Sequence, residues 1–200
     1  MKNSKKKALL GITSILCLLI VLVFFGMHFL MYPQIRKVED VICHYGYSKV
    51  SLKAYNAGEN EYFVVGHQEE QIGSAIEIKK RIQYQNGTCT YFSSTEDADQ
   101  YFYRNGIHHF PVSFELGEAS DAHISSLECG NDIKILYVID SIKGTNKAYI
   151  DVWDGTMVLE LEASLDDSSS IDMMIEILNK TGYSKYVASF VDELKAYVTD

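Results

Sequence analysis

The sequence predicts an α+β protein: an N-terminal single transmembrane helix followed by a mainly antiparallel sheet domain, with a C-terminal helix pair packed on one face. Three observations lead to this fold class. Residues 8–31 form an apolar run that contains no Asp, Glu, Lys or Arg. Short runs of β-branched and aromatic residues alternate with turn signals in the middle of the chain, which is typical of antiparallel hairpins. Apolar stripes with helical spacing then occupy 171–181 and 184–198.

The apolar run 8–31 is long enough to cross a bilayer. A helix rises about 1.5 Å per residue, so the run reaches roughly 36 Å, whereas a hydrocarbon core is ~30 Å thick. The run is longer than the apolar region of a signal peptide, and no small-x-small cleavage site follows it. We therefore interpret it as an uncleaved signal anchor of a single-pass protein in the cell membrane.

The distribution of charge predicts the topology. Four lysines precede the run, and all 27 acidic residues follow it. The positive-inside bias places the N-terminus in the cytoplasm and the C-terminal domain outside, although two basic residues soon after the run weaken that bias. The expected parts are a cytoplasmic basic tail, a transmembrane signal anchor, a juxtamembrane stalk helix and one extracytoplasmic α+β domain, at 1–7, 8–31, 32–46 and 47–200. Two small domains divided near 117–122 are the alternative to one.

The first predicted elements after the anchor are a helix and two strands. Residues 33–45 carry a single apolar stripe and end at Gly46, a natural helix stop. Residues 49–56 and 61–67 are rich in aromatic and β-branched residues and predict strands.

Residues 75–92 give the strongest local signal in the domain. Two β-prone runs flank Asn86-Gly87, which is the preferred two-residue hairpin turn because both central positions need positive φ. The turn explains this dipeptide better than glycosylation at Asn86-Gly87-Thr88 does.

Residues 94–106 predict a helix with both ends marked. Ser94 or Thr95 can cap its start, and Gly106 suits its end. The apolar side of this helix would consist of Ala98, Tyr101, Phe102 and Ile107. Residues 109–116 alternate well enough for an edge strand.

Residues 132–163 predict a three-stranded meander with its second turn at Asp154-Gly155. The first run is apolar on both faces at its centre, which indicates a middle strand or one covered by helices. The third run alternates Met157, Leu159 and Leu161 with Val158, Glu160 and Glu162. The C-terminal helix pair can then cover one face of the meander.

The folded portion is strongly acidic, with 14 basic against 27 acidic residues and therefore a formal charge of −13. This balance argues against nucleic acid and anionic lipid as partners, because both require a basic face. The expected partners are the membrane, through residues 8–31, and a protein or a cell-envelope component.

Cys43, Cys89 and Cys129 are an odd number of thiols in the folded portion. In an oxidising compartment one pair can form a disulfide, and Cys89 with Cys129 is the favoured pair because Cys43 lies on the stalk helix. Reduced, buried thiols are the competing interpretation. The spacing fits none of the CxxC patterns of zinc or redox sites, so we expect neither a metal nor a cofactor.

The sequence carries no local signature of catalysis or nucleotide binding. The nucleophile elbow GxSxG and the phosphate loops GxxxxGK[ST] and GxGxxG are absent. The only local histidine pair is His108-His109, and adjacent strand residues point to opposite faces, so the two do not chelate a metal together. We therefore assign no catalytic, cofactor-binding or metal-ligating residue.

These observations favour a membrane-tethered extracytoplasmic interaction or sensing module over an enzyme. The alternative is a cell-envelope hydrolase whose site is assembled from dispersed residues: His108, His109, His123 and Asp151. Convergence of two or more of these side chains in a concave pocket would favour the hydrolase.

Overall fold

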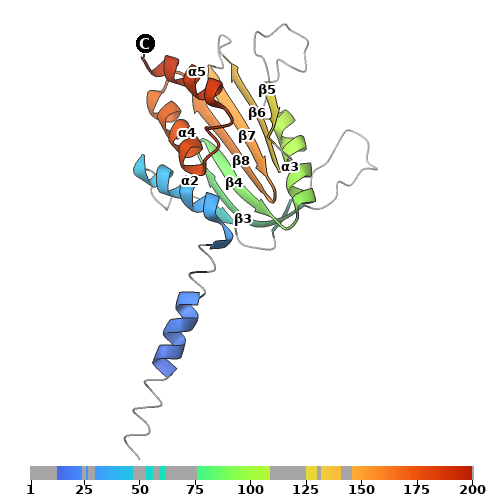
Figure 1. Ribbon diagram of the computed structural model, residues 1–200, viewed down its shortest axis with the longest axis vertical. Helices are drawn as coiled ribbons and strands as arrows, with labels where there is room; N and C mark the ends of the chain where they lie inside the picture. The colour runs from blue at the N-terminus through green and yellow to red at the C-terminus, as the bar shows by residue number, and fades with distance from the viewer. Residues whose placement is uncertain are drawn as a thin grey trace, which may run out of the picture.

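The computed structural model describes residues 13–23, 26, 30–46, 53–55, 59–61, 76–108, 125–129, 132–140 and 146–199 (Figure 1). Residues 13–23 are helical, so only part of the predicted anchor 8–31 is described. Of the helices in these ranges, none combines the length and the apolar character needed to cross a membrane. The strand predicted at 109–116 lies outside the described residues.

The described part of the domain is α+β, as predicted, and centres on an eight-stranded antiparallel sheet. The strands follow the order β1-β3-β4-β8-β7-β6-β5, and β2 also pairs with β3. Their bounds are β1 Lys53–Tyr55, β2 Glu59–Glu61, β3 Ile76–Tyr84, β4 Gly87–Phe92, β5 Ser125–Glu128, β6 Ile133–Asp140, β7 Lys147–Asp154 and β8 Met157–Ser164. The predicted hairpin and the predicted meander are both confirmed, and β4 joins them by pairing with β8.

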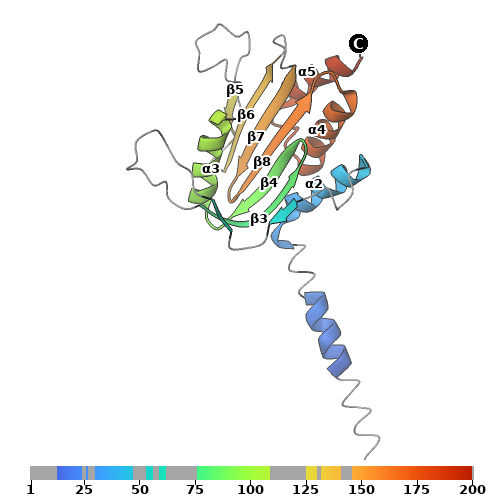
Figure 2. The same ribbon diagram turned by 180° about the vertical axis from the view of Figure 1, so that it is seen from behind.

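Four helices pack on this sheet in the described residues: α2 Pro33–His44, α3 Thr95–His108, α4 Ser168–Thr181 and α5 Ala188–Thr199. Figures 1 and 2 show α2, α4 and α5 grouped along one side of the sheet and α3 on its own at the other. Successive strand residues point to opposite faces, so each face has its own core. Leu159 belongs to the core under α2, α4 and α5, and Val158 belongs to the core under α3.

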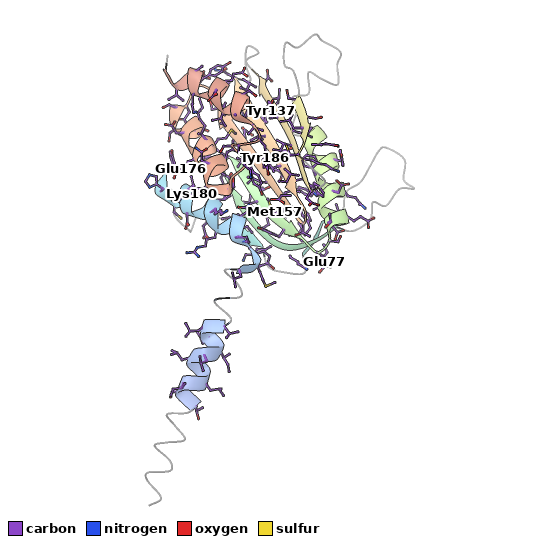
Figure 3. The ribbon with its side chains drawn as sticks, viewed as in Figure 1. Glu77, Tyr137, Met157, Glu176, Lys180 and Tyr186 are labelled. Carbon is purple, nitrogen blue, oxygen red and sulfur yellow. The ribbon has the colours of Figure 1, made fainter. Side chains whose placement is uncertain are left out.

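The larger core confirms that the C-terminal helix pair packs on one face. Ile150 and Leu159 supply its fully buried centre from the sheet. The ring of Tyr137 on β6 lies 4.9 Å, centroid to centroid, from Phe190 on α5. Figure 3 shows Tyr137 and Tyr186 where the sheet meets the helix pair, and both pack against this core.

Helix α2 is also part of the larger core. The predicted stripe is confirmed, because Val38, Val41 and Ile42 are fully buried. The helix packs against α4 and against β3 and β4. Helix α2, which lies within the stalk predicted at 32–46, therefore contributes apolar surface to the domain itself.

The turn of the β3–β4 hairpin differs by one residue from the prediction. Gln85 and Asn86 form the turn, and Gly87 is the first residue of β4, paired with Tyr84. Gly87 has φ +152°, and a Cβ placed on it would lie 2.0 Å from the backbone oxygen of Glu160. Glycine is therefore required for the close approach of β8, and not for a turn with positive φ at both central positions.

The central strand is β8, which lies between β4 and β7, whereas β6 is an inner strand between β7 and β5. Ile135 and Leu136 of β6 pack into the cores on opposite faces, so the prediction of a strand covered by helices is confirmed. Residues 157–161 of β8 are all buried, so both sets of its alternating residues are covered there. Helix α3 accounts for this burial, since it packs Ala98, Tyr101 and Phe102 over Val158. The alternation of residues along β8 could not by itself predict that a helix covers its second face.

Candidate functional site

The candidate functional site lies on the face of the sheet that α3 partly covers, around Glu160 of β8. Antiparallel register sets its neighbours, because Thr88 of β4 stands opposite Glu160 on one side and Asp151 of β7 on the other. Opposite positions bring Cβ atoms to about 5 Å. Two carboxyl groups and a hydroxyl thus share one row across three strands.

Glu160 is held by hydroxyl groups from two other elements. Tyr101 of α3 donates its phenolic hydrogen to Oε2 of Glu160 at 3.0 Å. The Thr88 hydroxyl donates to the same oxygen. Only 2% of Glu160 is exposed, so these hydrogen bonds replace water around a buried carboxylate.

Asp151 is buried beside this carboxylate and retains its proton more tightly than an exposed aspartate. Burial raises the pKa of Asp151 well above its usual value, and the nearby charge of Glu160 raises it further. Both effects favour the protonated form of Asp151. The pair can therefore accept hydrogen bonds through one member and donate through the other.

A guanidinium group lies in the same cluster, against α3. Arg81 of β3 is 6% exposed, and its Nε donates to Thr90 Oγ1 at 2.9 Å. Its guanidinium carbon also lies 5.4 Å from the centroid of the Tyr101 ring. Tyr101 therefore bridges a cation at its face and a carboxylate at its hydroxyl.

A pocket of about 160 Å³ opens next to Glu160. Its lining residues come from the β3–β4 hairpin and from β8: Gln83, Tyr84, Gln85, Gly87, Thr88, Glu160, Leu161 and Glu162. Glu160 is thus both a buried member of the carboxyl pair and part of the wall of an open pocket. A ligand in the pocket would meet amide, hydroxyl and carboxylate groups.

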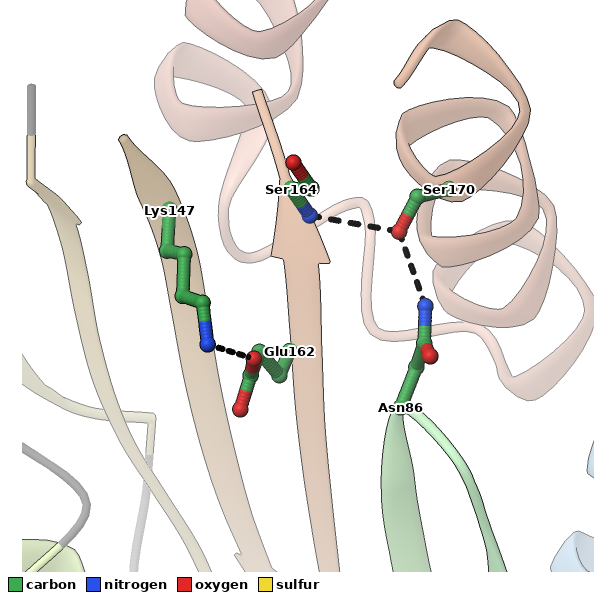
Figure 4. Close-up of polar contacts among 5 residues, drawn as sticks. All are labelled: Asn86, Lys147, Glu162, Ser164 and Ser170. Atoms are coloured by element: carbon green, nitrogen blue, oxygen red, sulfur yellow. Dashed lines mark hydrogen bonds and ion pairs between the residues drawn. The ribbon is translucent and has the colours of Figure 1, made fainter. Parts of the chain in front are cut away.

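Two sets of polar contacts hold the hairpin and β8 to their neighbours, and of their five residues Glu162 lines the pocket (Figure 4). Lys147 of β7 pairs with Glu162 at 2.5 Å, and hydrogen bonding to that carboxylate raises the pKa of Lys147. Asn86 in the hairpin turn donates to Ser170 Oγ of α4 at 2.8 Å, and that oxygen also accepts from the backbone N–H of Ser164 at 3.2 Å. The hairpin is therefore tied to α4 as well as to β8.

Helix α3 has a second attachment to the sheet. Lys134 of β6 pairs with Asp99 of α3 at 2.6 Å. Its ammonium lies 4.7 Å from the centroids of both the Tyr103 and the Trp153 rings. Trp153 is 5% exposed, so it is a packed core residue, and these contacts place α3 over Glu160.

Of the four residues considered for a hydrolase, only Asp151 has a described side chain. His108 ends α3 and its side chain is not described, whereas His109 and His123 lie outside the described residues. Among described residues, no group of three or more His, Cys, Asp or Glu could hold a metal ion. The structure adds Glu160 to the candidate site residues. In the sequence it could have been recognised as a charged residue at the centre of an otherwise apolar predicted strand.

The disulfide predicted between Cys89 and Cys129 is wrong, since all four cysteines are free. Cys89 lies on β4 and Cys129 directly follows β5, at the other end of the strand order. Four strand spacings of about 4.8 Å separate the two strands by roughly 19 Å, too far for a disulfide. Burial raises the pKa of the Cys89 thiol, so this thiol is unreactive.

Comparison with known proteins adds nothing to this geometry. No protein-family model matches the chain, and neither a curated protein nor a solved structure is significantly similar to it.

Proposed function

We propose that this chain is a membrane-tethered, extracytoplasmic interaction or sensing module that binds its partner at the pocket beside Glu160. The observation that carries the proposal is the position of Glu160. Glu160, whose carboxylate is buried beside Asp151 and held by Thr88 and Tyr101, is also one of the residues that line an open pocket. Perturbed titratable groups in a concave site are typical of functional sites.

The tether is supported by the sequence and by the exposure of the N-terminal helix. The run 8–31 has no charged residue, and basic residues precede it while all acidic residues follow it. Large apolar side chains between Ile15 and Val23 are 50% to 62% exposed. An apolar helix with exposure on all sides gains free energy from transfer into lipid.

The topology is tested by labelling thiols in intact cells with a membrane-impermeant maleimide. Cys43 is exposed on α2, Cys89 is buried and Cys129 is partly exposed, so the test uses a Cys129→Ser chain in which Cys43 is the informative thiol. We expect labelling of the Cys129→Ser chain in intact cells and its loss when Cys43→Ser is added. Labelling of Cys43 only after cell lysis would place the domain in the cytoplasm and contradict the proposal.

The pocket is tested by photo-crosslinking in membranes. A photoreactive amino acid replaces Gln85, which is exposed and lines the pocket, and in a matched chain it replaces Asp192 on α5. We expect a discrete adduct from position 85 alone, with its yield reduced by Thr88→Val. Identical adducts from both positions, or no adduct from position 85, would contradict binding at this pocket.

A cell-envelope hydrolase remains the second candidate because of one observation. Asp151 is protonated more readily than an ordinary aspartate and stands opposite Glu160, and glycosidases use two carboxyl groups of unequal pKa in this way. If the site is catalytic, purified full-length protein would release new reducing ends from cell-wall glycan, and Glu160→Gln would abolish that release. Equal release by wild type and Glu160→Gln would exclude this role.

A further inference from the structure

A second pocket, of about 140 Å³, lies where the N-terminal segment meets the sheet. Its wall includes Tyr32 from the chain before α2, Lys79 from β3, and Tyr91 from β4. Ser93 and Thr156 supply hydroxyl groups. Tyr32 directly follows the apolar run 8–31, so a helix crossing the membrane would end at the mouth of this pocket.

The polar groups of the pocket suit an anion. Lys79 is exposed and carries the only formal charge among the lining residues, and among the described residues no carboxylate lines the pocket. The hydroxyl oxygen of Ser93 is buried and has no hydrogen-bond partner in the described part of the chain. A lysine ammonium with hydroxyl donors is a common set of groups for binding phosphate.

The aromatic walls are fixed by contacts within the protein. The rings of Tyr32 and Tyr91 pack edge to face with centroids 5.1 Å apart. The hydroxyl of Tyr91 accepts a hydrogen bond from the backbone N–H of Gln34 at 3.2 Å. The pocket is thus formed before a ligand arrives, and it presents aromatic surface at the depth where Tyr side chains favour the membrane interface.

The local charge differs from that of the whole domain. Arg36 and Lys37 lie in the first turns of α2, a few residues beyond Tyr32, and Lys80 is opposite Tyr91 in the sheet. Glu77 is on the same strand as Lys79 and does not line the pocket. A domain with a formal charge of −13 therefore has cationic groups at the end from which the anchor leaves.

We propose that this pocket binds the phosphate of a membrane phospholipid headgroup. The proposal rests on the membrane tether proposed above, because the tether brings the pocket to headgroup level. Binding one headgroup needs a single cation and a few donors, not the basic face that a charged membrane surface requires. The bound lipid would hold the acidic domain against the membrane in one orientation.

The test uses the full-length protein in maltoside micelles and native mass spectrometry. Phosphatidylglycerol is compared with a diglucosyl diacylglycerol that has the same acyl chains and no phosphate. We expect one phosphatidylglycerol to be retained per chain and the glycolipid to be lost. Lys79→Gln combined with Ser93→Ala should weaken retention roughly 10- to 100-fold, the usual effect of losing hydrogen bonds to a charged group.

Lys195→Gln on α5 is the matched control, because Lys195 is exposed and pairs only weakly with Asp192. We expect it to retain lipid as the wild type does. Equal retention of both lipids, or equal losses in the double variant and the control, would overturn the proposal. Glycerol 1-phosphate binding as tightly as the lipid would assign the site to a soluble phosphate compound and would also overturn it.

A separate experiment tests whether the chain is tethered to the membrane. Alkaline carbonate extraction of cell membranes reports whether the chain is inserted, whereas retention in micelles reports only the pocket. Thermal unfolding of each variant confirms that it is folded before its retention is compared.

Discussion

Asp151 on β7 and Glu160 on β8 face each other directly across two antiparallel strands, and 3% and 2% of the two residues are exposed. Hydroxyl groups from β4 and α3 both donate to Glu160. A proton on Asp151 removes one of the two negative charges that this buried pair would otherwise carry. The stability of the domain should depend on that proton.

The free energy of unfolding should fall as pH rises because of Asp151. The pKa of Asp151 is raised in the folded state, so the folded state binds the proton more tightly than the unfolded chain. Stability from this group is fully present below the unfolded pKa of about 4 and is lost as pH rises through the folded pKa. Asp151→Asn removes this contribution to the pH dependence. Relative to the wild type, the free energy of unfolding of the variant should therefore rise by up to about 1.4 kcal/mol for each pH unit above pH ~4.

Urea unfolding of the full chain, followed by circular dichroism between pH 4 and pH 8, measures this difference. Asp192→Asn on α5 is the control, since its side chain is 74% exposed. A constant difference between Asp151→Asn and wild type over this pH range would contradict the raised pKa of Asp151 in the folded state.

Removing the phenolic hydroxyl of Tyr101 should destabilise the domain by about 1–3 kcal/mol, because the buried carboxylate of Glu160 loses a donor. Tyr101→Phe keeps the ring and its contact with Phe92, whose centroid is 4.9 Å away. Tyr103→Phe is the matched control on the same helix, because Tyr103 is 47% exposed. Equal effects of the two substitutions on the urea midpoint would show that the hydroxyl contributes nothing to Glu160.

Gly87→Ala should cost at least about 2 kcal/mol or prevent folding. Its Cβ would lie 2.0 Å from the backbone oxygen of Glu160, and the backbone at φ +152° disfavours any side chain. Gly155→Ala has φ +58° and open space around its Cβ, so only the conformational cost of about 1–2 kcal/mol applies. Thermal unfolding should rank wild type, Gly155→Ala and Gly87→Ala in decreasing stability, and the reverse order of the two variants would disprove the close approach.

Ser170→Ala should cost about 1–3 kcal/mol, because two donors lose their acceptor. Ser170 is 4% exposed and accepts from Asn86 and from the backbone of Ser164 (Figure 4). Ser169→Ala next to it is exposed and keeps its backbone N–H bonded to Asp167, so it should be nearly neutral. Hydrogen exchange at residues 85–87 should also accelerate in Ser170→Ala, and unchanged exchange there would refute the proposed tie between hairpin and helix.

Local signals in the sequence were sufficient for most elements. Ser94, one of the two predicted caps, caps the start of α3, with its hydroxyl accepting from the N–H of Asp97 at 3.0 Å. Gly182 ends α4 with φ +89°, as expected of a helix stop. Helix α5 begins at Ala188, four residues later than predicted, because 183–187 form turns instead. Each of these signals depends on residues a few positions apart in the chain, so it can be recognised in the sequence.

Turn positions were predicted to within one residue, and that is not enough to define the site. The second hairpin turns at Gly155 and Thr156, which pairs Asp151 with Glu160. A turn at Asp154-Gly155 would shift the register by two residues, so that Asp151 would stand opposite Val158 and Glu160 opposite Tyr149. A shift of two residues keeps each side chain on its own face of the sheet but changes every cross-strand partner.

The sequence by itself determined the α+β class of the domain, the hairpin, the meander, the C-terminal helix pair and the separation of an apolar run from an acidic portion. Periodicity, caps and charge are properties of consecutive residues, and they survive without tertiary contacts. Only the tertiary structure decided that β8 is central and that Glu160 is buried. Thr88 and Tyr101 reach Glu160 from 72 and 59 residues away along the chain, and no local pattern specifies contacts over such separations.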